Sequence, residues 1–125
     1  MSTRSLIGLE EDGKVRYIYC HFDGYIQEGV GEELPKKFTT VEDIKELLSF
    51  GNRSSILDYE TCDSQYGGEA ESSEVCSSIE EYKKDGFDRD TEYAYLFKDG
   101  EWYYLETQSW HIDFSKEFKL VKEAL

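Results

Sequence analysis

The residues best suited to chemistry lie together in the run Tyr19–Tyr25, where a strand pattern ends in a turn signal. Cys20, His21 and Asp23 place a thiol, an imidazole and a carboxylate within four residues. A thiol can act as a hydrolytic nucleophile when a base lies on its sulfur, and that base usually comes from elsewhere in the fold. Neighbouring residues of a strand point to opposite faces, so His21 is poorly placed to activate Cys20, and His111 is the other candidate base. The alternative is that Cys20 is a small core residue and His21 caps the following turn.

A metal site is not indicated by the spacing of the available ligands. Zinc ligands commonly occur as CxxC, HxxxH or HExxH pairs, and the chain has none of these. Residues 58–77 also lack the regular acidic spacing of a calcium loop. We therefore expect no metal and no cofactor.

Two arginine segments could complete an anion site beside this run. Thr3-Arg4-Ser5 and Arg53-Ser54-Ser55 each combine a guanidinium with hydroxyl groups, which suits an anionic ligand or a carboxylate of the fold. If both approach the run, they would form a basic, aromatic-lined pocket for a nucleotide-like ligand. The alternative is that the arginines pair with nearby acids. The candidate residues for ligand binding are Arg4, Ser5, His21, Asp23, Tyr25 and Arg53.

The charge of the chain restricts its partners. The net charge is −14, and residues 58–92 hold twelve acids against three basic residues. Such a field repels phosphate backbones and anionic bilayers, so we expect no direct nucleic-acid partner and no membrane partner. A basic surface of a host protein is the favoured partner, including that of a nucleic-acid-binding enzyme; the alternative is that the charge serves only solubility. The candidate contact residues are six of these acids and three aromatic residues: Asp58, Glu60, Asp63, Glu69, Glu71, Glu74, Trp102, Tyr104 and Trp110.

The length and composition predict one folded domain over residues 1–125. The chain has 125 residues and 15% aromatic residues, enough for a single core. Three cysteines cannot all pair within the chain, no secretory segment follows Met1, and no apolar run approaches the roughly 18 residues of a membrane span. A reducing cytoplasm is therefore the expected compartment.

The elements that must position these residues are two β-hairpins and two or three short helices. Asp12-Gly13 and Lys98-Asp99-Gly100 each separate two β-prone runs, which is the strongest local hairpin signal. Apolar stripes predict helices at about 26–34, ended or kinked by Pro35, and at 40–50 between a Thr40 cap and a Gly51 stop.

The remaining segments are less regular. The polar stretch 58–77 predicts a flexible acidic loop, and one or two helical turns follow from Ser78 to about Asp85-Gly86. The tail from Phe114 fits a helix or an edge strand, and we favour the helix. The expected fold is α+β, an antiparallel sheet built from both hairpins with the helices packed on one face.

The N-terminal part of the chain also carries a set of spaced motifs: Thr3-Arg4-Ser5-x-Ile7-Gly8, Asp12-Gly13, Tyr17-x-Tyr19-Cys20-His21-x-Asp23-Gly24-Tyr25, Gly29-x-Gly31-x-x-Leu34 and Leu47-x-x-x-Gly51-x-x-Ser54. Over residues 3–57 these motifs resemble a family of small proteins from bacteriophages and prophages. Members commonly have Trp at the position of Phe22 and Pro at the position of Ile26, and this departure loosens the turn. The resemblance implies a context, the cytoplasm of a bacterial host. Small acidic products of such genes often inhibit host-defence nucleases by occupying their nucleic-acid-binding surfaces.

Overall fold

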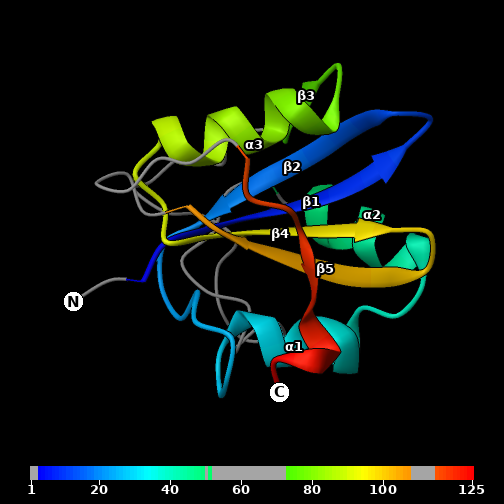
Figure 1. Ribbon diagram of the computed structural model, residues 1–125. Coiled ribbons are helices and arrows are strands. Elements are labelled where there is room, and N and C mark those ends of the chain that lie inside the picture. The colour runs from blue at the N-terminus through cyan, green and yellow to red at the C-terminus, as the bar shows by residue number, and fades with distance from the viewer. Residues whose placement is uncertain (1–2, 50, 52–72, 108–114) are drawn as a thin grey trace.

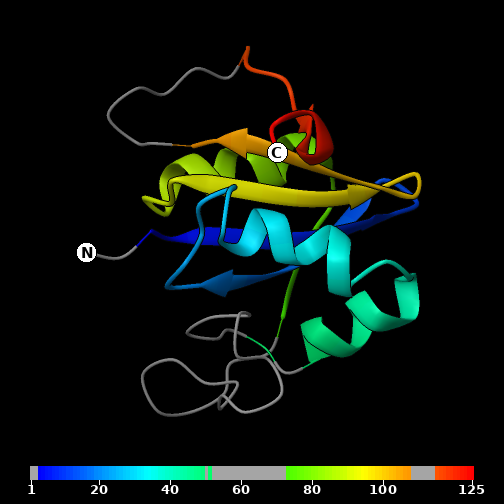
Figure 2. The same ribbon diagram turned by 90° about the horizontal axis from the view of Figure 1, so that it is seen from below.

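The computed structural model describes residues 3–49, 51, 73–107 and 115–125 (Figures 1 and 2). They form a six-stranded sheet in the order β3-β2-β1-β4-β5-β6 with three α-helices, so the predicted α+β fold is confirmed. The strands are β1 (Ser5–Glu11), β2 (Lys14–Cys20), β3 (Glu74–Cys76), β4 (Tyr93–Lys98), β5 (Glu101–Glu106) and β6 (Lys119–Leu120).

Both predicted hairpins are present. Asp12-Gly13 joins β1 to β2 and Asp99-Gly100 joins β4 to β5, and all four turn residues have positive φ, between 51° and 84°. Such turns have the twist that antiparallel strands need, which is why Asp-Gly is favoured there. The hairpins join through a parallel pairing of β1 with β4, and the other strand pairs are antiparallel.

The helices cover both faces of the sheet. Helices α1 (Val30–Lys37) and α2 (Val41–Ser49) pack on one face, and α3 (Ile79–Asp88) lies on the other, as Figures 1 and 2 show. Successive side chains of a strand point to opposite faces, so the sheet contributes residues to a core on each side. Ile18 faces α1 and α2, whereas Tyr17 faces α3. The expectation of helices on one face therefore holds for α1 and α2, and α3 buries the second face.

The first helix begins later than predicted. Instead of a helix from residue 26, the chain makes turns up to Gly29, the N-cap of α1, and the Val30 amide donates to the Asp23 carbonyl at 2.7 Å. Gly29 permits this tight path, because a Cβ there would lie 2.5 Å from the Tyr25 carbonyl oxygen. Pro35 lies inside α1, which continues to Lys37.

The other two helices start at side-chain caps. Thr40 Oγ1 accepts a hydrogen bond from the Asp43 amide at 3.1 Å, and Gly51 follows α2 with φ of 76°, as predicted. Ser78 Oγ accepts from the Glu81 amide at 3.1 Å at the start of α3. This helix passes through Gly86 to Asp88 rather than ending at Asp85-Gly86. A Cβ at Gly86 would lie 3.1 Å from Thr107 Cγ2 and 3.5 Å from Ala94 Cβ, so the glycine allows close packing at this position.

The ends of the sheet differ from the sequence prediction. Residues 58–72 of the predicted acidic loop lie outside the described residues, and Glu74–Cys76 forms β3, which pairs with β2.

The prediction of a helix for the tail from Phe114 is wrong. Lys119–Leu120 pairs with β5 and a 3-10 turn, Val121–Glu123, follows. A strand fits because Phe118 packs on the α3 face and Val121 on the opposite face, whereas a helix would place both on one side.

In the part of the chain described above, no helix has the length and apolar character needed to cross a membrane.

Candidate functional site

Cys20 and His21, which the sequence marks as candidates for nucleophilic chemistry, have structural contacts. Cys20 ends β2 with an exposed fraction of 0%, and its thiol donates to the Phe22 carbonyl oxygen at 3.4 Å. His21 Nδ1 lies 2.7 Å from the Tyr19 hydroxyl oxygen. Partial burial and the positive charge of Arg4 lower the pKa of His21. The third catalytic candidate, His111, lies outside the described residues.

The candidate ligand residues near the N-terminus attach this segment to the rest of the fold. The Arg4 amide donates to Glu92 Oε2 at 2.6 Å, and its guanidinium lies 3.6 Å from Asp90 Oδ2. This matches the alternative in which the arginine pairs with nearby acids. Tyr25 donates its hydroxyl to Asp23 Oδ1 at 3.0 Å.

The two remaining ligand candidates are Ser5 and Arg53. Ser5 is fully buried on β1 beside Gly24, where a Cβ on that glycine would lie 3.1 Å from the Ser5 Oγ. Arg53 lies in the stretch whose structure is not described. The structure therefore brings Arg4, His21 and Glu92 together, but it does not show the two arginine segments converging.

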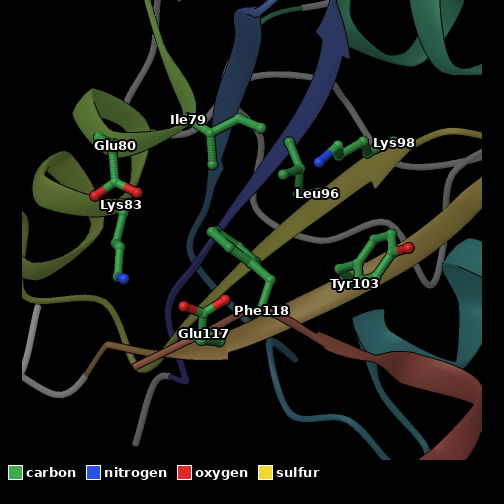
Figure 3. A pocket seen from close by; sticks show the side chains of 8 residues that line it. All are labelled: Ile79, Glu80, Lys83, Leu96, Lys98, Tyr103, Glu117 and Phe118. Carbon is green, nitrogen blue, oxygen red and sulfur yellow. The ribbon is translucent and has the colours of Figure 1, made fainter. Parts of the chain in front are cut away.

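A pocket of about 310 Å³ lies on the α3 face of the sheet (Figure 3). Its floor and walls come from α3, β4, β5 and the C-terminal segment, which are far apart in the sequence. The lining residues are Ile79, Glu80, Lys83, Leu96, Lys98, Tyr103, Glu117 and Phe118. None of them was a candidate from the sequence.

Lys83 is the unusual residue of this pocket. It is 5% exposed, and within the part of the chain that the structure describes its ammonium makes no ion pair or hydrogen bond. Lys83 lies four residues after Ile79 and four before the buried Phe87, in the stripe of α3 that packs on the sheet. A lysine inside an apolar helical stripe is the sequence signal that could have identified this site.

A second concavity of about 530 Å³, which we call the acidic groove, lies between β3 and α3. It is lined by Tyr17, Val75, Cys76, Ser77, Glu81, Lys84, Asp85 and Asp88. Val75 is 64% exposed and sits at the outer edge of the sheet.

Hydrogen bonds and ion pairs fix the wall of the acidic groove. Asp85 Oδ2 accepts from the Tyr17 hydroxyl at 2.5 Å and from Arg89 Nε at 3.0 Å. Arg89 also reaches Glu74, with Nη2 2.5 Å from a carboxylate oxygen. Burial and the bond to Asp85 raise the pKa of Tyr17, so this hydroxyl remains a donor at neutral pH. These contacts connect β2, β3 and α3 at this edge of the sheet, where Arg89 pairs with the carboxylates of Glu74 and Asp85.

The predicted partner-binding residues divide between this edge, the core and the undescribed stretches. Glu74 lies on β3 beside the acidic groove. Trp102 is 4% exposed, and its indole N–H donates to the Phe38 carbonyl at 2.9 Å, so it belongs to the core rather than to a recognition surface. Tyr104 is half-buried against the same core. The remaining candidates lie outside the described residues: Asp58, Glu60, Asp63, Glu69, Glu71 and Trp110.

Among the described side chains, no group of three His, Cys, Asp or Glu residues is arranged as a set of metal ligands. Burial raises the pKa of the Cys76 thiol, which opposes formation of a thiolate there. No protein-family model, curated protein or solved structure matches the chain.

Proposed function

We propose that this protein binds a basic surface of a host protein, and that it thereby blocks a surface used for nucleic acid. The observation that supports the proposal is the distribution of charge on the fold. Of the 28 acids, 22 lie in the described residues, so the fold itself carries most of the negative charge. A compact acidic scaffold steers positively charged partners toward itself and repels phosphate backbones.

The acidic groove is the place where we propose that the partner sits. Glu81, Asp85 and Asp88 lie on one side of α3, and β3 is the last strand of the sheet at this edge. An extended basic segment beside β3 would have backbone groups to pair with, Val75 to cover and carboxylates within reach. In the sequence, the acids from Asp58 to Glu71 precede this strand directly and add to the same charge.

The resemblance of residues 3–57 to small bacteriophage and prophage proteins adds a biological context to the proposal. In that context the partner would be a nuclease of host defence, because such enzymes expose a basic nucleic-acid channel. Blocking this channel needs no reacting group on the inhibitor, which agrees with a buried Cys20.

The test is cleavage of duplex DNA by a panel of bacterial nucleases in the presence of increasing amounts of this protein. We expect inhibition of at least one enzyme, relieved by excess DNA and by raising the salt from about 50 mM to about 300 mM, because salt screens charge attraction. The Glu74→Gln/Asp88→Asn variant should require about ten times more protein for the same inhibition.

A matched variant controls for net charge. Glu42→Gln/Glu46→Gln removes two exposed carboxylates from α2, on the opposite face of the sheet. It should inhibit as well as the unmodified protein. Absence of inhibition throughout the panel, inhibition insensitive to salt, or equal weakening in both variants would reject the proposal.

A further inference from the structure

We infer that the pocket between α3 and the C-terminal segment binds a small organic anion with an apolar body of one or two rings, held through its charged group by Lys83. This inference is independent of the proposed protein partner, because the pocket and the acidic groove have different linings.

Lys83 is almost fully buried and has no ion-pair partner among the described residues. Lysine side chains are rarely buried to this extent. The stem of Lys83 packs against the fold, whereas its ammonium is not among the fully buried polar atoms and keeps access to solvent at the pocket. The structure leaves 5% of Lys83 exposed and provides no carboxylate within 4 Å among the described residues. Its three N–H donors are thus available to a carboxylate or a similar anionic group inside the pocket.

The size and the lining of the pocket suit a ring system. A cavity of about 150 Å³ can hold benzene, so about 310 Å³ has room for a larger ring system with a short acidic substituent. Leu96 is buried, and Phe118 lies parallel to Tyr82 with an angle of 8° between the ring planes. Tyr82 is itself fixed by a hydrogen bond of 2.5 Å to the Tyr95 carbonyl. The Phe118 ring is therefore a supported flat wall, which suits a planar ligand.

The charged residues of the pocket differ in their exposure. Lys83 is buried, Lys98 is half-buried, and Glu80 and Glu117 are exposed. Figure 3 shows the two lysines on either side of the apolar side chains, coming from α3 and from β4. Carboxylates at the rim repel polyanions such as nucleoside triphosphates, whereas a single negative charge can reach the Lys83 ammonium. The arrangement therefore selects singly charged ligands.

The probes are indole-3-acetate and its neutral analogue indole-3-acetamide, which have the same ring and differ in charge. Binding is followed by titration of ¹⁵N-labelled protein in two-dimensional NMR, up to about 10 mM ligand. We expect saturable shifts centred on residues 79–83, 96–98, 103 and 117–118, with the acid binding at least about tenfold more tightly than the amide. Absence of saturable shifts with the acid, or equal affinity of the two probes, would overturn the inference.

The matched variants are Lys83→Met and Lys84→Met. Both replace a lysine of α3 by an unbranched apolar residue, but Lys84 is exposed and does not line this pocket. We expect Lys83→Met to weaken indole-3-acetate binding about 10- to 100-fold without changing the affinity for the amide, and Lys84→Met to leave both unchanged. Unchanged affinity of Lys83→Met for the acid, or equal loss in both variants, would refute the role of Lys83. Should Lys83→Met fail to fold, the comparison of acid with amide on the unmodified protein decides.

Discussion

Replacement of Tyr95 by Phe should destabilise the protein, because it removes a hydroxyl that is hydrogen-bonded to Gly24. The Tyr95 hydroxyl donates to the Gly24 carbonyl oxygen at 2.6 Å, across 71 residues of sequence. Gly24 in turn donates its amide to the Thr3 carbonyl at 2.9 Å, so this bond ties the segment between β2 and α1 to the centre of the sheet. Burial raises the pKa of Tyr95, and the hydroxyl therefore remains a donor over the whole pH range of a stability measurement.

The magnitude follows from the burial of both partners. Removing the hydroxyl leaves the buried Gly24 carbonyl without this donor, which costs about 1–3 kcal/mol of unfolding free energy. Unfolding entropy is about 2.1 cal/mol/K per residue, so for 125 residues each kcal/mol corresponds to about 4 °C in Tm. Tyr95→Phe should therefore lower Tm by about 4–11 °C.

Tyr93→Phe is the matched control for this measurement. Tyr93 lies two residues earlier on the same strand and face, and its hydroxyl makes no hydrogen bond in the described part of the chain. Its replacement should change Tm by less than about 2 °C in differential scanning calorimetry. If the Tm of Tyr95→Phe also changed by less than about 2 °C, or if the Tm of both variants fell by the same amount, the role of the hydrogen bond to Gly24 would be refuted.

Three further predictions test the core and the titrating groups. Gly8→Ala should lower the unfolding free energy by about 1–3 kcal/mol in urea titration, because its Cβ would lie 2.9 Å from the Tyr82 ring; an unchanged midpoint would contradict the close packing. Partial burial lowers the pKa of His21 below its usual 6.5, so the unfolded chain binds the proton first and stability should fall as the pH drops from about 7 to about 5. His21→Gln should lose this part of the pH dependence, and an identical pH profile would show that His21 does not contribute. Iodoacetamide should modify Cys76 before Cys20 in the native protein, as read by peptide mass spectrometry, and equal rates would contradict the burial of Cys20.

Local sequence patterns predicted the hairpins and α2, because these elements are determined by residues close together in the sequence. Each hairpin follows from an Asp-Gly pair between β-prone runs, and α2 follows from the Thr40 cap, an apolar stripe and Gly51. On β4, Tyr93, Tyr95 and Phe97 alternate along the strand and therefore share one face, where Tyr95 and Phe97 are part of the core.

The features that the sequence did not predict depend on contacts between distant segments. Nothing local indicates that β1 pairs in parallel with β4, or that Gly86 continues α3 because it lies against Thr107. The tail became a strand because β5 offered an edge, while its residue types fit either structure. Lys83 was missed for the same reason: a helical stripe shows that its position is buried, but only the fold shows that no carboxylate meets it.

The parallel pairing of β1 with β4 determines when this protein can fold. This pairing brings together residues that are far apart in the sequence, such as Ser5 and Tyr93. The middle of the sheet therefore forms only after most of the chain has left the ribosome. Until then the N-terminal hairpin has an open, apolar inner edge at Leu6–Leu9. Docking of the second hairpin against this edge is therefore the slow step that we expect in refolding, and the nascent chain is most prone to aggregate just before it.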